Sequence, residues 1–254
     1  YCQLAFGRVG PVWYAEGMAE VGQYWGGNDK SVKTPEPGIA YLRSRPPKPL
    51  LEIVDNPLET TGDSWQNYAW RWALCHLLGF NETYTDRFKP LGLGMLNGQE
   101  IGFTQIYGEQ AAEIQFEYHL FVKHLCPGYR VDLCSWDWKA KPLPPKKTGT
   151  TVKVQAGRGW QPARLRLGAK VAYGCGASGG WAVDGRGDTP TAPGGGRLVG
   201  CIYSDYKLSE EFDIGTQAEF VAPADGALFL RCRDDWGSLA DNKGTMTFKL
   251  RSLE

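Results

Sequence analysis

A proline- and lysine-rich stretch at residues 139–150, Lys-Ala-Lys-Pro-Leu-Pro-Pro-Lys-Lys-Thr-Gly-Thr, constrains this sequence more than any other feature. Closely spaced prolines favour an extended backbone and the lysines keep it in water, so neither a helix nor a central strand should continue through it. The residues before the stretch carry helical patterns, whereas those after it carry short alternating patterns. We therefore predict a multidomain α and β chain: a mainly helical domain over 1–138, a linker over 139–150 and an all-β domain over 151–254.

In the first domain, apolar residues recur every three to four positions in several segments. We expect helices at 11–20, about 65–78, 82–96 and 109–125. Pro90 and Gly92 should break the third of these helices. A long irregular excursion is expected over 21–63, where Gly, Pro, Asn and Asp are frequent, with a short extended piece from Leu50 to Val54.

The charge balance bears on the partners of the chain. Lys and Arg together number 28, as do Asp and Glu, so the formal net charge is zero. A nucleic-acid-binding protein normally carries an excess of basic residues, which this sequence lacks. No apolar run reaches the length of a membrane-spanning helix. We expect neither a nucleic-acid partner nor a membrane span.

The seven cysteines are an odd number, so at least one lies outside any intrachain disulfide. No Cys-x-x-Cys pair occurs, which argues against a structural zinc ribbon. Cys126 and Cys134 flank a Pro-Gly loop and are the preferred disulfide pair if the compartment is oxidising. The alternative is that the cysteines are buried thiols that pack like small hydrophobic side chains.

The segment from Pro11 to Glu20 reads as a short helix with a defined carboxylate face. Pro11 suits a first helical position, and Glu16 and Glu20, four apart, share one face. Gly17 costs about 1 kcal/mol relative to Ala inside a helix, so we expect a packing reason for it. Spacing alone leaves two interpretations: an amphipathic helix with solvated glutamates, or a helix that presents Glu16 to a metal.

The pattern Trp-x-x-Glu-Gly-x-Ala-Glu at residues 13–20 resembles the downstream helix of gluzincin-type metallopeptidases, including bacterial zincin-like families. The resemblance implies that Glu16 is the third zinc ligand, after two histidines of an upstream His-Glu-x-x-His helix. No such box occurs here: His76 reads as an ordinary partly buried helix histidine, and His119 and His124 as structural or surface residues. We therefore expect a fragment whose zinc box precedes Tyr1, and we assign no catalytic residue within the chain.

Short alternating segments follow residue 150, separated by glycine-rich turns at 176–180 and 193–196. The expected strands are 151–155, 163–167, 171–173, 198–203, 218–221, 227–232 and 246–250. Short strands at this spacing are typical of an antiparallel sandwich or jelly roll.

Three motifs in this region are Leu-Val-Gly-Cys-Ile at 198–202, Phe-Val-Ala-Pro at 220–223 and Asp-Asp-Trp-Gly-Ser-Leu-Ala-Asp-Asn-Lys-Gly at 234–244. Together, residues 160–250 resemble the calcium-dependent galactose-binding (PA-I-like) lectin family of bacteria. The resemblance implies a small β-sandwich, galactose-binding-domain-like, and one bound Ca²⁺. The implied ligands are Asp234, the carbonyl of Ser238, Asp241, Asn242 and the carbonyl of Asp184.

Calcium takes six to eight oxygen ligands from carboxylates, amides and carbonyls, which this loop offers. The alternative is an acidic turn in which Asp-Asn-x-Gly serves only as a hairpin. Asp234, Asp241 and Trp236 are the candidate sugar contacts. The loop 185–193 lacks the His and Gln with which the family contacts galactose, so galactose specificity is not expected to carry over.

Two functions are carried forward. In the first, the chain is a fragment of an extracytoplasmic (secreted, periplasmic or cell-surface) bacterial metallopeptidase-like protein, with a Ca²⁺-binding, carbohydrate-binding domain and Zn²⁺ in the full-length parent. Its partners would be a glycan or protein substrate and the upstream part of the parent. In the alternative, the chain is a non-catalytic surface or assembly protein with a degenerate zincin domain, and another chain could supply its missing helices.

Overall fold

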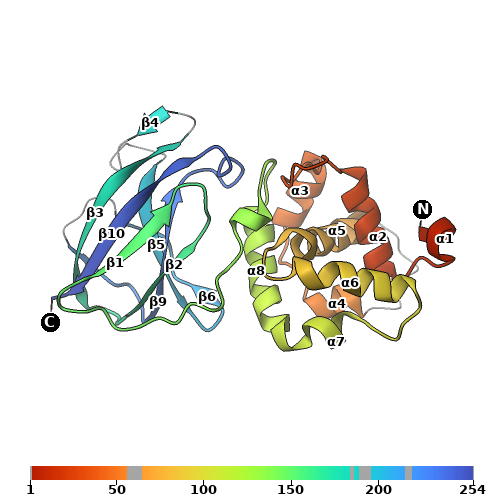
Figure 1. Cartoon of the computed structure of the whole chain (residues 1–254), viewed down its shortest axis with the longest axis horizontal. Coiled ribbons are helices and arrows are strands. Elements are labelled where there is room, and N and C mark those ends of the chain that lie inside the picture. Colours follow the sequence, from red (N-terminus) through yellow and green to blue (C-terminus); the bar gives the residue numbers. More distant parts are fainter. Residues whose placement is uncertain (1, 56–64, 184–185, 189–195, 215–218, 254) are drawn as a thin grey trace. The chain divides into compact units, whose positions relative to one another are not determined.

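The computed structural model describes residues 2–55, 65–183, 186–188, 196–214 and 219–253 (Figure 1). The chain divides into two compact units, Tyr1–Ser135 and Trp136–Glu254. The first unit is helical, and the second is built from antiparallel sheets.

Helices make up the regular structure described in the first unit. They are α1 (Cys2–Phe6), α2 (Val12–Gln23), α3 (Glu36–Arg43), α4 (Leu50–Val54), α5 (Trp65–Phe80), α6 (Thr85–Leu96), α7 (Phe103–Tyr107) and α8 (Ala111–His124), with 3-10 turns η2 (Gly108–Gln110) and η3 (Val131–Leu133). The expected helices at 11–20, 65–78 and 109–125 are confirmed within a few residues.

Helix α5 is the central element of this unit. Its residues from Trp70 to Leu78 are all buried, and it contacts α2, α3, α6 and α8. A helix that is apolar on all sides is stable only when other elements cover every side. α2 approaches it closely at Gly17, where an added Cβ would lie 2.7 Å from the carbonyl oxygen of Arg71 and still closer to the thiol of Cys75. The predicted packing reason for Gly17 is confirmed.

Three expectations for the first unit were wrong. The stretch 21–63, expected to be irregular, contains helix α3, which buries Ile39 and Leu42. Residues 50–54 form helix α4 rather than an extended piece, because Leu50 and Ile53 are three apart and are buried on one side of a helical turn. Helix α6 continues through Pro90 and Gly92. An added Cβ at Gly92 would overlap the side chain of Tyr14, so this glycine serves close packing rather than a break.

The predicted disulfide between Cys126 and Cys134 is not formed, because both residues are present as thiols. The Cys134 side chain instead hydrogen-bonds with the hydroxyl of buried Tyr129. Burial is the main cause that raises the pKa of Tyr129 well above its usual value, and Cys134 adds to it.

The strands of the second unit form two sheets. They are β1 (Thr150–Gln155), β2 (Gln161–Leu167), β3 (Ala172–Val183), β4 (Arg186–Asp188), β5 (Arg197–Ser204), β6 (Lys207–Leu208), β7 (Phe212–Asp213), β8 (Glu219–Val221), β9 (Gly226–Arg233) and β10 (Lys243–Ser252). One sheet has the order β1-β10-β3-β4, with β8 also paired to β3. The other has the order β2-β9-β5-β6, with β7 also paired to β5.

The two sheets share one hydrophobic core. Val154 on β1 lies opposite Met246 on β10, and both are fully buried together with Leu228 and Leu230 of β9 in the other sheet. Because side chains alternate between the two faces of a strand, each second residue of β10 points into this core. The alternating patterns of the sequence reflect this arrangement.

The glycine-rich segment 176–180, expected to be a turn, is the middle of strand β3. It pairs with β10 from Gly176 opposite Lys249 to Gly180 opposite Thr245. Gly179 has φ +100°, and an added Cβ would lie 2.9 Å from the carbonyl oxygen of Thr245. Gly179 therefore allows the backbones of β3 and β10 to approach closely, which is a known reason for glycine inside a strand.

The boundary between the units lies earlier than residue 138. Trp136 stacks on Phe229, with ring centroids 3.9 Å apart, and Trp138 contacts Tyr203. Leu143, in the middle of the expected linker, exchanges backbone hydrogen bonds of 3.0 and 2.9 Å with Arg164 and Arg166. Trp136, Trp138 and Leu143 all find their partners in the second unit. The chain before β1 therefore packs against this unit.

Among the helices that the structure describes, none combines the length and the apolar character needed to cross a bilayer.

Candidate functional site

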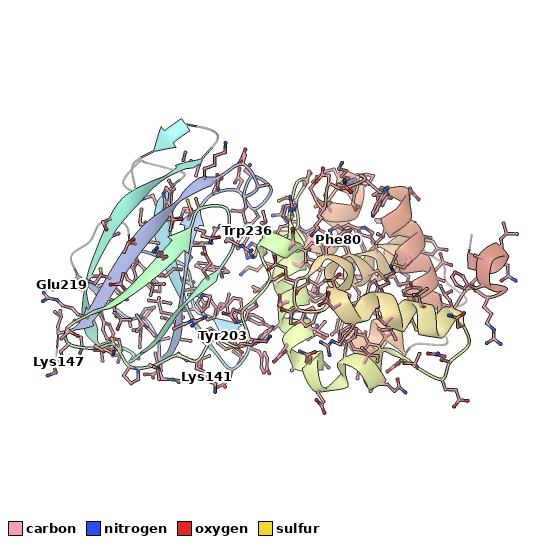
Figure 2. The ribbon with its side chains drawn as sticks, viewed as in Figure 1. Phe80, Lys141, Lys147, Tyr203, Glu219 and Trp236 are labelled. Carbon is pink, nitrogen blue, oxygen red and sulfur yellow. The ribbon has the colours of Figure 1, made fainter. Side chains whose placement is uncertain are left out.

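The candidate site is the loop 234–242, which joins β9 to β10 (Figures 1 and 2). β9 lies inside its sheet, paired to β2 and β5. Leu239 is fully buried and anchors the middle of the loop. The backbone also packs tightly against the turn at Gly157, where an added Cβ would lie 3.0 Å from the carbonyl oxygen of Leu239. The loop is thus held at its start, middle and end by the sheets.

Arg231, near the end of β9, fixes the start of the loop. Its side chain is buried, with Cζ 4.2 Å from the centroid of the Trp236 ring and 5.3 Å from that of Trp160. It pairs with Glu211 at 3.2 Å and donates a hydrogen bond of 3.2 Å to the backbone carbonyl of Asp234. Arg suits this position because its planar guanidinium can stack on aromatic rings while its N–H groups bind acceptors at the edge.

Arg231 is not among the site residues predicted from the sequence. The signal was a charged residue in an otherwise apolar stretch, Gly-Ala-Leu-Phe-Leu-Arg at 226–231. A buried charge is rarely tolerated without partners. A charged residue at this position therefore predicts that neighbouring segments, such as the loop that follows, supply its partners.

Two of the expected calcium ligands each have a buried oxygen atom that lacks a hydrogen-bond partner among the described residues. They are Oδ2 of Asp234 and Oδ1 of Asn242. The amide nitrogen of Asn242 is engaged, since it donates to the carbonyl of Ala156 at 3.5 Å. Leaving a buried acceptor without a partner costs about 1–3 kcal/mol, and more for a charged group. Both residues therefore present acceptors that a cation would satisfy.

The other expected ligands lie in different surroundings. The carbonyl of Ser238 accepts a 3.3 Å hydrogen bond from the backbone N–H of Asp241, and the Asp241 side chain is exposed. Asp184 lies outside the described residues. No group of three His, Cys, Asp or Glu side chains that could hold a metal occurs within the part of the chain that the structure describes.

The donors of the loop nevertheless fit calcium in kind. Calcium accepts amide and backbone carbonyl oxygens beside carboxylates and does not require three acidic side chains. Asp234, Asp241, Asn242 and the carbonyl of Ser238 supply these oxygen types within nine positions of the sequence. A soft metal that prefers thiolate or imidazole would find no ligand in this loop.

Among the expected sugar contacts, Trp236 has a flat aromatic side chain, the shape that can pack against a sugar ring. It is half-buried, and its ring lies against the guanidinium of Arg231, with Cζ 4.2 Å from the ring centroid. An indole held in this way is a rigid apolar surface within the acidic loop.

The predicted zinc ligand Glu16 lies on α2 in the first unit and is half-buried. Trp13, one turn earlier, is buried against Phe103, with ring centroids 6.3 Å apart. The zinc role of Glu16 stays a prediction.

Comparison with known proteins gives little. No protein-family model matches the chain, and no curated protein sequence matches it. The chain is similar to a solved structure described as "EclA N-terminal domain; PllA-like lectin", with 19% sequence identity and a TM-score of 0.30. The match covers 40% of this chain and 94% of that one.

Proposed function

We propose that residues 136–254 form a calcium-dependent carbohydrate-binding domain, a β-sandwich of the galactose-binding type. The observation that carries the proposal is the pair of buried acceptors, Oδ2 of Asp234 and Oδ1 of Asn242, at the two ends of one anchored loop, for which the described residues supply no hydrogen-bond partner. The resemblance in the sequence selected the same two residues independently of this burial.

Asp234 and Asn242, with Asp241, the carbonyl of Ser238 and Asp184, would hold the ion. Bound Ca²⁺ supplies positive charge and open coordination positions for sugar hydroxyls. The carboxylates of Asp234 and Asp241 can also accept hydrogen bonds from those hydroxyls. Trp236 would pack against the apolar face of the sugar ring and fix its orientation.

We place the protein outside the cytoplasm. Extracellular modules bind calcium with Kd values of about 10⁻⁴ to 10⁻³ M, so a loop with few acidic ligands can be filled there. The competing function is that of a surface or assembly protein, in which the same loop binds a protein partner instead of a glycan.

Binding of the full chain to an array of immobilised glycans, in calcium and in chelator, tests the proposal. We expect calcium-dependent binding that is lost in Trp236→Ala and in Asp241→Ala, and retained in Asp235→Ala. Asp235 is the matched control, because it is exposed, lies in the same loop and is not among the expected ligands. Binding that chelator leaves unchanged would contradict the role of calcium, and absence of binding to any glycan would favour a protein partner.

A further inference from the structure

The guanidinium of Arg231 uses all three of its nitrogen atoms. Nε and Nη2 donate to one carboxylate oxygen of Glu211, at 3.3 and 3.2 Å. Nη1 donates to the backbone carbonyl of Asp234 at 3.2 Å. The arginine is 5% exposed, so water competes little for these bonds. One buried side chain therefore joins the segment before β7 to the first residue of the loop 234–242.

Two indole rings hold the plane of this guanidinium. Its Cζ lies 4.2 Å from the ring centroid of Trp236, within the loop, and 5.3 Å from that of Trp160. Trp160 belongs to the turn 156–160 between β1 and β2, and the same turn holds the far end of the loop. There the carbonyl of Ala156 accepts a 3.5 Å hydrogen bond from the side chain of Asn242. The turn and the arginine thus hold opposite ends of one loop.

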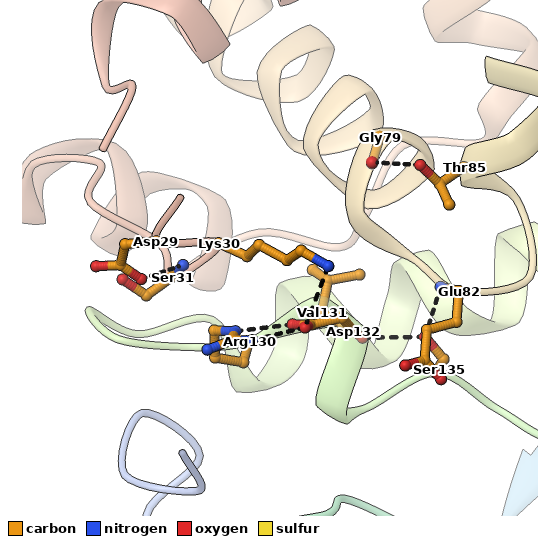
Figure 3. A network of polar contacts seen from close by, with 10 residues as sticks. All are labelled: Asp29, Lys30, Ser31, Gly79, Glu82, Thr85, Arg130, Val131, Asp132 and Ser135. Carbon is orange, nitrogen blue, oxygen red and sulfur yellow. Dashed lines mark hydrogen bonds and ion pairs between the residues drawn. The ribbon is translucent and has the colours of Figure 1, made fainter. Parts of the chain in front are cut away.

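An ion pair in the first unit offers a contrast. Arg130 binds Asp132 through Nε and Nη2, at 2.8 and 2.6 Å, so both carboxylate oxygens accept a hydrogen bond (Figure 3). Asp234, beside Arg231, is different. Its backbone carbonyl is bound, yet its buried Oδ2 has no hydrogen-bond partner among the described residues. Arg231 thus fixes the main chain of this residue and leaves one oxygen of the carboxylate available to a ligand.

The positive charge of Arg231 does not explain its place beside a loop that we propose to bind a cation. Like charges repel, and the repulsion is stronger in a buried setting than in water. Glu211, 3.2 Å from the guanidinium, offsets this charge. What remains useful is the shape of the side chain. Its fork reaches two acceptors while its plane stacks on a ring, which the single ammonium group of a lysine cannot do.

We propose that Arg231 is the positioning residue of the loop 234–242. It holds the backbone of Asp234 and the ring of Trp236 in place before calcium binds, which reduces the entropy lost when the ion orders its ligands. The backbone N–H of Ser238 adds to this order by donating to the carbonyl of Asp235 at 2.9 Å. This inference rests on the function proposed above. It adds that a residue outside the expected ligand set determines the affinity for calcium.

Isothermal titration calorimetry of the full chain with calcium tests the proposal in Arg231→Met, because positioning and charge predict opposite results. Removal of a positive charge by itself would tighten binding of a cation, whereas loss of positioning should raise the Kd at least tenfold. Arg233→Met is the matched control. The ion pairs described for Arg233 are with Glu211 and Asp213, so its loss should leave the Kd unchanged or lower it.

Arg231→Lys provides a second variant, which keeps the positive charge and loses the planar fork. We expect it to raise the Kd as well, because the loop depends on the shape of the arginine and not on its charge. A Kd in Arg231→Met that equals or falls below that of the wild type would overturn the proposal. Full wild-type affinity in Arg231→Lys would also overturn it.

A measurement without calcium separates this proposal from the proposed function. NMR order parameters of the loop amides in chelator report motion on the picosecond-to-nanosecond timescale, so they do not depend on the free energy of unfolding. For Ser238 and Asp241 we expect values of about 0.85 in the wild type, as in a rigid backbone, and below about 0.6 in Arg231→Met.

A wild-type loop that is flexible in chelator, or equal order parameters in both proteins, would overturn the positioning role of Arg231. A wild type that binds no calcium would instead contradict the proposed function. In that case the order parameters alone decide whether Arg231 positions the loop.

Discussion

The guanidinium of Arg231 is stacked on the ring of Trp236, with Cζ 4.2 Å from the ring centroid, and the same guanidinium donates to the backbone of Asp234. One side chain of the sheet thus positions both the aromatic surface and the first acidic residue of the loop. The integrity of the proposed calcium site should therefore depend on a residue that is not itself an expected ligand.

Replacing Arg231 by Met should lower the free energy of unfolding of the second unit by about 1–3 kcal/mol, because a buried partner of Glu211 is lost. Arg233→Met is the matched control. Arg233 contacts the same Glu211 at 2.8 Å but is about one-third exposed, so its loss should cost less than about 1 kcal/mol. Urea unfolding of both variants measures the difference, and equal losses would show that burial of Arg231 does not matter.

Calcium should stabilise the second unit. An ion that binds only the folded loop adds RT ln(1 + [L]/Kd), which is about 2.7 kcal/mol at a hundredfold excess over Kd. Asp241→Ala should remove most of this gain, and Asp235→Ala should keep it. Thermal unfolding with calcium and with chelator measures both. Identical midpoints of the wild type in the two conditions would mean that the loop is an acidic turn.

Gly17→Ala should destabilise the first unit by about 1–3 kcal/mol, because the added methyl group overpacks the contact between α2 and α5. Gly22→Ala lies on the same helix, and its methyl group would meet no described atom within 4 Å. That control should stabilise the unit by about 0.5–1 kcal/mol through helix propensity. Destabilisation by both substitutions to the same extent would contradict the close approach at Gly17.

Acidification should destabilise the first unit through His76. Burial lowers the pKa of this imidazole to about 3, and the charge of Asp132 opposes the shift only in part. The unfolded chain takes up a proton near its ordinary pKa of about 6.5 while the folded chain does not, so stability falls as the pH drops from 6.5 toward 3.

Between pH 6 and 5 the loss due to this residue should be about 1 kcal/mol. His76→Phe keeps the ring stack and removes the titration. Urea unfolding of the first unit at both pH values should show a smaller pH dependence in the variant. The same pH dependence in both proteins would place the proton uptake elsewhere.

Local patterns predicted much of this molecule. The change from helical to alternating periodicity separates the two units, and the strands around Val154, Leu230 and Phe248 lie close to where alternation placed them. Asp234 and Asn242 were also selected from the sequence, through the resemblance of their loop. Each of these features depends on neighbours a few positions away, which a sequence displays directly.

Tertiary packing decided the rest. Trp136 belongs to the second unit because Phe229, far along the chain, supplies its stacking surface. Arg231 matters because Trp160 and Trp236 enclose it. Periodicity records which face of an element is apolar. Which distant side chain covers that face, and whether a buried polar atom finds a partner, depends on contacts between segments that no local pattern contains.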